Sequence, residues 1–195
     1  MSCCIFADPD QDSEYIQYIS DYLDMEVVNE IPLSGSFIDL RMNGLHFTKD
    51  STNLSSSLHV DFLSGPMGWR LKRTEHETSI KKAIGKNKED IIIFDGTAGL
   101  LSDTIIFLAL GHKVVACEQS KIIFLLVNDA IERAKSKLPF FENLLFLNAK
   151  SETQYKETDN IDIVYLDPMY PEPSKNLLRS GDISTINHIL DIENI

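Results

Sequence analysis

The second half of the chain alternates between uninterrupted apolar runs and stretches with helical periodicity. The apolar runs lie at residues 91–94, 113–117, 144–147 and 161–166. Between these runs, residues 102–110 and 119–136 carry apolar residues at helical spacing. Continuous apolar runs are typical of parallel strands that are buried on both faces. The pattern therefore predicts a doubly wound α/β domain. Its strands lead into polar residues that meet at one edge of the sheet, namely Asp95, Glu118, Asn148 and Asp167.

The first sixty residues predict a smaller α/β unit. Residues 3–7 read as a strand, and Asp12 or Ser13 precedes a helix with apolar positions on one face. Asn43-Gly44 is a dipeptide that favours a two-residue hairpin turn. We expect the strands of this meander at residues 37–42, 45–48 and 58–63.

Composition places the chain among ordinary globular proteins. Its 195 residues are 43% hydrophobic and 25% charged, which suits one main domain. No apolar run reaches the roughly 18–20 residues of a membrane span, and the first ten residues lack a basic segment. The three cysteines fit neither a disulfide framework nor a zinc site, and the five histidines show no ligand spacing. We expect a cytoplasmic protein with no membrane or metal partner.

Charge is distributed unevenly. Residues 1–60 carry 10 acidic and 2 basic side chains, whereas residues 61–90 carry 5 and 7. A local basic segment attracts phosphates even when the whole chain carries a net charge of −12. The residues expected to contact RNA are Arg70, Lys72, Arg73, Lys81 and Lys82.

The first strand of the main domain leads into Asp95-Gly96-Thr97-Ala98-Gly99-Leu100. Glycines let this turn approach a ligand closely, but the segment is not the G-x-G-x-x-G dinucleotide fingerprint. A carboxylate at the strand tip suits a cationic amino-acid end and repels a diphosphate. Glu118 follows Gly99 by 19 residues, near the offset at which an acid binds ribose hydroxyls. The spacing predicts a nucleoside site.

The fourth apolar run ends in Tyr165-Leu166-Asp167-Pro168-Met169-Tyr170-Pro171. Proline biases Asp167 toward extended backbone, so its carboxylate and nearby carbonyls are held in place. Such acceptors can bind both N–H groups of an exocyclic amine and orient its lone pair, while Tyr170 offers a stacking face. We therefore predict Asp167, Pro168 and Tyr170 as the catalytic residues.

These motifs resemble those of the bacterial RsmJ family over roughly residues 35–180. Members of that family are class I, Rossmann-like methyltransferases. They place a methyl group from S-adenosylmethionine (SAM) on the exocyclic N2 of a guanine in small-subunit (16S) ribosomal RNA. The resemblance implies this fold, this cofactor, and ribosomal RNA or the 30S particle as partner. Together with Asp95 and Gly99, it implies cofactor contacts from Ser102, Asp103, Glu118, Gln119, Lys150, Ser151 and Asp167.

The sequence departs from the family pattern in two places. Residues 73–77, with Glu75 and Glu77, replace a glycine-rich basic loop, and residues 168–195 show no pattern matching the family's final strands. We expect an N-terminal subdomain at residues 1–68, a basic linker and helix at 69–89, and a Rossmann-like domain at 90–195 that lacks the C-terminal strands.

Other functions remain open from the residues themselves. The departures would also suit a catalytically impaired RNA- or ribosome-binding descendant of the fold. An NAD-dependent oxidoreductase is disfavoured by Asp95 and by the absence of G-x-G-x-x-G. A DNA adenine methyltransferase would share an Asp-Pro-x-Tyr tract, and only substrate tests separate it from an RNA enzyme.

Overall fold

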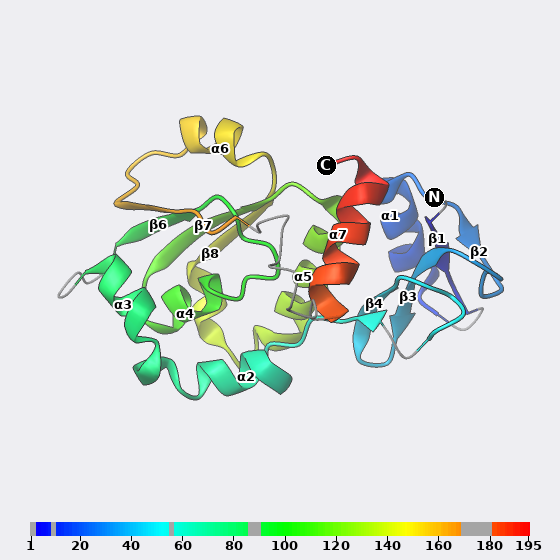
Figure 1. Ribbon diagram of the computed structural model, residues 1–195, viewed down its shortest axis with the longest axis horizontal. Coiled ribbons are helices and arrows are strands. Elements are labelled where there is room, and N and C mark those ends of the chain that lie inside the picture. Colours follow the sequence, from blue (N-terminus) through cyan, green and yellow to red (C-terminus); the bar gives the residue numbers. More distant parts are fainter. Residues whose placement is uncertain (1–2, 9–10, 55–56, 86–90, 169–180) are drawn as a thin grey trace, which may run out of the picture. The chain divides into compact units, whose positions relative to one another are not determined.

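A computed structural model describes residues 3–8, 11–54, 57–85, 91–168 and 181–195 (Figure 1). The chain divides into two compact units that interleave along the sequence. One comprises residues 1–60, 120–129 and 170–195, and the other comprises residues 61–119 and 130–169. The sequence did not predict that a helix near the C-terminus belongs with the first sixty residues.

The first unit is built on a five-stranded mixed sheet in the order β2-β1-β3-β4-β5. β1 runs parallel to β2 and β3, and the hairpin neighbours are antiparallel. Its elements are β1 (Cys3–Phe6), α1 (Ser13–Leu23), β2 (Val27–Val28), β3 (Ser36–Arg41), β4 (Gly44–Thr48), β5 (Ser57–Leu58), the first part of α5 (Lys121–Ala134), and α7 (Gly181–Glu193). The predicted small α/β unit is therefore present.

Helix ends in this unit follow the expected physical chemistry. The Asp12 carboxylate accepts hydrogen bonds from the Glu14 and Tyr15 amides and caps α1. Ile16 and Ile19 are buried on the inner face of that helix. The Glu193 carboxylate accepts from the Lys121 amide at 2.9 Å, so α7 supplies a negative charge at the N-terminus of α5.

The hairpin turn lies one residue earlier than predicted. Arg41 pairs with Gly44, so Met42 and Asn43 form the turn. Gly44 has φ +118° and takes the first paired position after it. The pairing of β3 with β4 is one-to-one up to this pair, and of residues 42–44 only Gly44 has a positive φ, which glycine adopts readily.

The last predicted strand of this region is also shorter than expected. β5 covers Ser57–Leu58 only, whereas residues 58–63 were predicted. The Asp61 carboxylate accepts hydrogen bonds from the Leu63 amide at 2.8 Å and from the Ser64 hydroxyl at 2.5 Å. Such local side-chain bonds stabilise a turn and compete with strand pairing.

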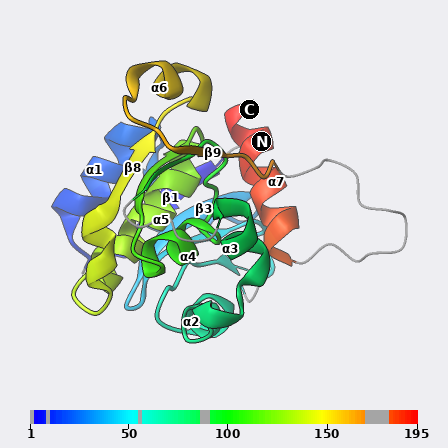
Figure 2. The same cartoon turned by 90° about the vertical axis from the view of Figure 1, so that its left-hand side faces the viewer.

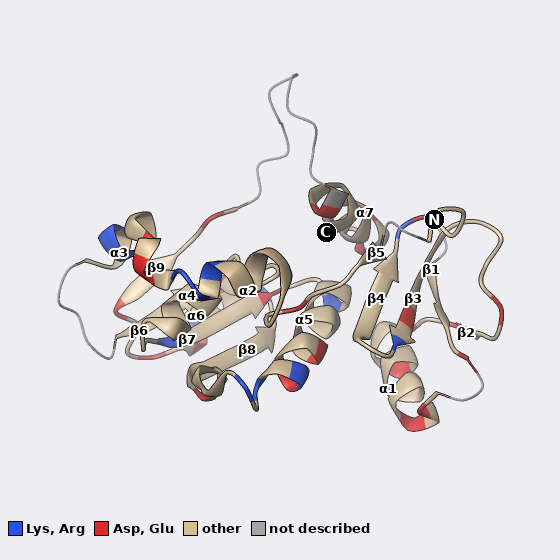
Figure 3. Ribbon diagram, turned by 90° about the horizontal axis from the view of Figure 1, so that it is seen from below, with Lys and Arg blue, Asp and Glu red and all other residues tan. Residues whose placement is uncertain are grey.

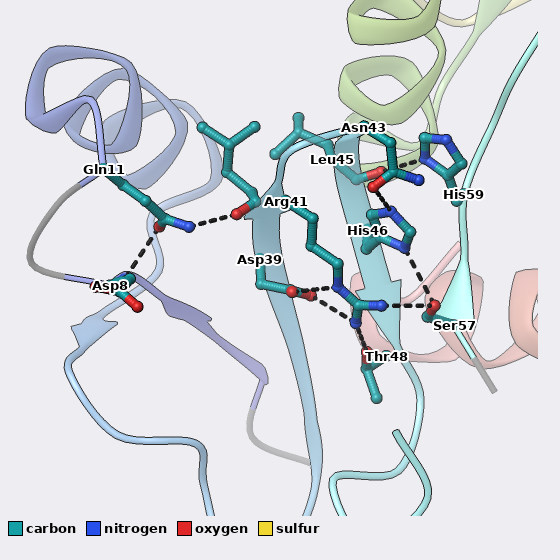
Figure 4. Close-up of polar contacts among 11 residues, drawn as sticks. Asp8, Gln11, Asp39, Arg41, Asn43, Leu45, His46, Thr48, Ser57 and His59 are labelled. Atoms are coloured by element: carbon teal, nitrogen blue, oxygen red, sulfur yellow. Dashed lines mark hydrogen bonds and ion pairs between the residues drawn. The ribbon is translucent and has the colours of Figure 1, made fainter. Parts of the chain in front are cut away.

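A polar cluster lies on β3, β4 and β5 (Figure 4). Asp39 forms an ion pair with Arg41, whose guanidinium also donates to the Ser57 hydroxyl at 3.4 Å. Ser57 lies 3.1 Å from Nδ1 of His46, and the His46 ring stacks on His59 with centroids 4.2 Å apart. These bonds satisfy buried polar groups within the sheet, so both histidines have structural partners.

The second unit contains a four-stranded parallel sheet in the order β8-β7-β6-β9. Its elements are α2 (Gly65–Leu71), η1 (Thr74–His76), α3 (Thr78–Ile84), β6 (Ile92–Asp95), α4 (Thr104–Ala109), β7 (Lys113–Glu118), the end of α5, η2 (Pro139–Asn143), β8 (Leu144–Asn148), α6 (Ser151–Glu157), and β9 (Ile163–Tyr165). The predicted parallel α/β fold is confirmed.

Helices cover both faces of this sheet. On one face, the Phe94 ring of β6 meets Tyr155 of α6 at 5.5 Å between centroids. On the other face, Tyr165 of β9 meets Phe107 of α4 at 5.0 Å. Figures 1 and 2 show α6 and α4 on opposite sides of the sheet. This two-sided cover explains the continuous apolar runs of the central strands β6 and β7, whereas Leu145 and Val164 on the edge strands are 52% and 44% exposed.

Candidate active site

The polar residues that follow the strands of the second unit lie at one edge of its sheet. Because β6 is parallel to β7 and β9, and β7 is parallel to β8, all four carboxyl ends face the same way. The Asn148 side-chain amide donates to the Glu118 carbonyl at 2.8 Å. The Gly96 amide donates to the Tyr165 carbonyl at 3.1 Å. Ligands of such sheets bind beyond this edge, so it is the candidate site.

Asp95 ends β6 and shapes the loop that follows it. Its side chain is buried, and its two oxygens accept hydrogen bonds from the Thr97 amide and the Thr104 hydroxyl. Burial raises the pKa of Asp95, while these hydrogen bonds act in the opposite direction. Both oxygens are therefore engaged in holding the loop, and a cofactor contact from Asp95 stays a prediction.

Two residues of this loop adopt left-handed backbone conformations. Gly99 has φ +49° and Leu101 has φ +61°. The conformation costs a non-glycine residue roughly 1–2 kcal/mol. Leu101 is fully buried, so core packing holds the strained residue in place. Strain of this kind concentrates at functional sites, and here it directs Ser102 and Asp103 toward the start of α4.

Asp103 is oriented by two side chains from other elements. The Tyr165 hydroxyl donates to Oδ2 of Asp103 at 2.7 Å, and the Arg70 guanidinium donates to Oδ1 at 3.0 Å. Burial raises the pKa of Tyr165, and its hydrogen bond to Asp103 raises it further. The phenol therefore stays protonated as a donor. About a quarter of the Asp103 side chain remains exposed, so the carboxylate can still receive a ligand.

Arg70 of α2 connects this loop to the segment before α3. It donates to both oxygens of Glu77 at 3.0 Å and to the Ser102 carbonyl at 2.7 Å, in addition to Asp103. We call these contacts the Arg70 clamp. The hydrogen bond from Arg70 lowers the pKa of Glu77. Arg70 was expected to contact RNA, and that contact stays a prediction; its hydrogen bonds show that it orders the loop after β6.

Gly96 lies where three segments meet. A Cβ atom at this position would lie 2.8 Å from Cδ2 of Leu166 and 3.1 Å from Cβ of Ser151. Thr97 makes a second connection, because its hydroxyl oxygen accepts a hydrogen bond from the Asp167 amide at 2.8 Å. The loop after β6 thus lies against both the start of α6 and the Asp-Pro segment after β9.

The remaining predicted residues fall into three groups. Gln119, Lys150 and Ser151 follow β7 and β8 at the same sheet edge, next to Glu118. Asp167 and Pro168 are exposed after β9, whereas Tyr170 lies outside the described residues. Four of the five expected RNA contacts lie on or beside α2 and α3, and their side chains are not part of the clamp: Lys72, Arg73, Lys81 and Lys82.

Sequence reasoning missed the side chains that organise the site. Nothing in the chain pattern pointed to Tyr165 as a partner of Asp103, because the tyrosine reads as an apolar strand residue. Glu77 was noted only as a departure from the family pattern, and nothing in the sequence pointed to its ion pair with Arg70. Among the described residues, no group of three or more His, Cys, Asp or Glu side chains is placed to hold a metal ion. In the same residues, no helix has the length and apolar character needed to cross a membrane.

Comparison with known proteins gives consistent matches. A family model described as "Putative SAM-dependent methyltransferase" matches residues 24–193. A curated relative from Alcanivorax borkumensis, named "Ribosomal RNA small subunit methyltransferase J", is 33% identical over 172 residues, covering 84% of this chain and 67% of the relative. Relatives of the same name from Desulfotalea psychrophila and Shewanella denitrificans are 32% and 34% identical, covering 70% and 78% of this chain.

The matched region is shorter than the relatives themselves. The chain spans 55% of the Desulfotalea protein and 64% of the Shewanella protein. Among solved structures, a SAM-dependent methyltransferase from Neisseria gonorrhoeae superposes with a TM-score of 0.68 and 24% identity. That likeness covers 88% of this chain and 71% of the other, and it establishes a shared fold.

Proposed function

The chain belongs to the SAM-dependent methyltransferase family whose model it matches, and from this premise we propose that it methylates the exocyclic N2 of a guanine in small-subunit ribosomal RNA. The main support for the proposal is the hydrogen bond that the Asp167 amide donates to the Thr97 hydroxyl oxygen. It joins the acid expected to hold the target base to the loop expected to hold the cofactor. The curated relatives are named as methyltransferases of small-subunit ribosomal RNA, which supports this choice of substrate. The proposal also includes a cytoplasmic location.

The residues at the sheet edge fit SAM by their chemistry. Asp103 offers an oriented, partly exposed carboxylate for the cationic methionine end. Glu118 is the last residue of β7, at the position of a ribose-binding acid. Gly96 lets the loop pack directly against Leu166 and Ser151, and Gly99 supplies a left-handed turn, so the loop backbone lies at this sheet edge. Further contacts in this proposal come from Ser102, Gln119, Lys150, Ser151 and Asp167.

The protein's part in the reaction is to bind and orient. Bound SAM supplies a methyl group on a sulfonium, which needs no covalent enzyme intermediate. The Asp167 carboxylate and the Pro168 carbonyl accept hydrogen bonds from the guanine amine and aim its lone pair. Both residues are exposed, so a base can reach them from solvent once it leaves its stack. A stacking role for Tyr170 stays a prediction.

A binding protein without turnover is the second candidate function. It was suggested by Glu75 and Glu77 in the basic segment. Glu77, however, is neutralised by Arg70, and that pair supports the cofactor loop. The ordered Asp103 carboxylate and the attached Asp-Pro segment favour a catalytic site over this alternative.

Methyl transfer to RNA tests the proposed function directly. Small-subunit RNA lacking base methylation is incubated with the protein and SAM carrying a labelled methyl group, and the products are digested to nucleosides. We expect labelled N2-methylguanosine, and its loss in Asp167→Ala. Asp159→Ala is the matched control, because Asp159 is exposed and precedes the same strand at its opposite end. No transfer to RNA, or transfer to another position, would refute the proposal.

A further inference from the structure

Trp69 is an exposed aromatic side chain beside the candidate site. It is the only tryptophan in the chain, and 58% of its surface is accessible. The guanidinium carbon of Arg73 lies 4.5 Å from the centroid of its ring. A tryptophan usually buries most of its large apolar surface, so this exposure is unusual for packing and typical of a recognition surface.

The neighbours of Trp69 on α2 explain why it points outward. Gly68 packs so closely that a Cβ there would lie 2.7 Å from the Leu63 backbone. Arg70 turns to the cofactor loop through the clamp. Successive helical residues are about 100° apart, so these two inward contacts leave Trp69 on the solvent side. Packing therefore fixes the helix and exposes the ring.

The charges around Trp69 suit a polyanion. Lys72, Arg73 and Lys82 are exposed and form no salt bridge within the described part of the chain. Of the two nearby acids, Glu77 pairs with Arg70 and Glu75 lies 3.4 Å from His76. Figure 3 shows basic positions on α2 and α3 and acidic positions on α1.

The two compact units differ strongly in charge. The first contains 15 acidic and 5 basic residues, whereas the second contains 15 and 13. Phosphates are repelled by the first unit and attracted to basic positions of the second. An RNA strand bound to this protein is therefore expected along α2 and α3.

We propose that Trp69, with Arg73, forms a platform on which an unpaired base of the RNA substrate stacks. The inference rests on the proposed function for the identity of the RNA. It adds a second point of recognition, for a nucleotide near the methylated guanine. Aromatic and guanidinium planes bind the exposed faces of unpaired bases, which a duplex keeps stacked.

The platform is coupled to the cofactor loop by the next residue along the helix. Arg70 bonds directly to Ser102 and Asp103, so α2 and the loop are held together. A base stacked on Trp69 is then fixed relative to the residues proposed to bind SAM. This arrangement selects RNA whose target guanine lies in a single-stranded segment.

Tryptophan fluorescence provides a direct readout because the emission comes from Trp69 alone. The full chain is titrated with a short single-stranded RNA containing guanines, with the same RNA in a duplex, and with an abasic strand of equal length. We expect strong quenching by the single strand and much weaker quenching by the other two. Equal quenching by the abasic strand would overturn stacking and leave only charge attraction.

Variants separate stacking from charge. By fluorescence anisotropy of labelled single-stranded RNA, Trp69→Ala should weaken binding about 5- to 150-fold without changing the salt dependence. Trp69→Phe should lose less RNA affinity than Trp69→Ala, because phenylalanine keeps an aromatic ring. Lys82→Gln should instead reduce the salt slope by about one. Met42→Ala, at a fully exposed residue of the first unit, is the control and should stay within about twofold. Unchanged affinity of Trp69→Ala would overturn the proposal.

Failure of this inference is distinguishable from failure of the proposed function. If methyl transfer occurs but Trp69→Ala binds RNA normally, only the platform is wrong. If base-dependent quenching of the wild type and weaker RNA binding by Trp69→Ala in the anisotropy measurement are observed without methyl transfer, the platform stands and the catalytic proposal is refuted. SAM binding should be unaffected by Trp69→Ala, since the clamp runs through Arg70.

Discussion

Replacing Arg70 by alanine should destabilise the cofactor loop and not merely weaken RNA binding. The substitution removes hydrogen bonds to three partners: Glu77, Asp103 and the Ser102 carbonyl. The three charged side chains are 23–27% exposed, so each contact lies between a screened surface pair and a buried charged hydrogen bond. At about 1 kcal/mol for each partner, the loss is about 2–3 kcal/mol. This corresponds to a fall in Tm of about 5–10 °C for a chain of this size.

Scanning calorimetry and SAM titration together test this prediction. Arg70→Ala should show the lower Tm and a SAM affinity about tenfold weaker, because Asp103 keeps only Tyr165 of its two described donors. Lys82→Ala removes an exposed charge from α3 and should change Tm by less than about 2 °C. If the Tm of Arg70→Ala equals that of the wild type and only its RNA affinity falls, Arg70 is a phosphate contact and the clamp is refuted.

Three further substitutions test other parts of the site. The pKa of Glu77 is lowered from its ordinary value near 4.5, so its pairing stabilises the fold above that pH and is lost as pH falls. The Tm difference between wild type and Glu77→Gln should therefore shrink from pH 6 to pH 3, and a constant difference would contradict this. Gly99→Ala should cost about 1–2 kcal/mol at φ +49°, although the nearest atom to the added methyl would be the Thr97 carbonyl oxygen at 4.0 Å, and an unchanged free energy of unfolding would contradict the strain. Tyr165→Phe should weaken SAM binding while lowering stability by only about 1 kcal/mol, and equal SAM affinity would exclude its role in orienting Asp103.

The architecture was predictable where one physical rule dominated. Parallel strands covered on both faces are apolar along their buried length, and residues 92–94 of β6 and 114–117 of β7 carry that pattern plainly. Asp12 was a visible helix cap, and it caps α1 in the structure. Each of these features depends on nearest neighbours in the chain or on simple burial.

Prediction was weaker where two local preferences compete. Asn43-Gly44 favours a two-residue turn, but pairing of Arg41 with Gly44 moves the turn to Met42 and Asn43. Residues 59–63 have the composition of a strand, yet the Asp61 carboxylate binds nearby donors and ends it. The outcome depends on small energy differences between alternatives that the residue pattern leaves open.

The site was predictable as a set of strand ends but not as a network. Asp95, Glu118 and Asp167 were identified because each follows an apolar run of the same sheet. Their partners come from distant positions, since Arg70 is 33 residues from Asp103 and Tyr165 is 62 residues from it. Such pairings depend on side-chain orientation in the folded protein, for which the sequence carries no periodic pattern.

Calorimetric titration with SAM tests the central claim most directly. The account predicts micromolar binding to the wild-type chain, its loss in Glu118→Ala and Asp167→Ala, and unchanged binding in Asp159→Ala. These outcomes would place the cofactor at the carboxyl ends of β7 and β9. Absence of binding at millimolar SAM, or equal binding by all four proteins, would contradict the assignment of this sheet edge as the active site.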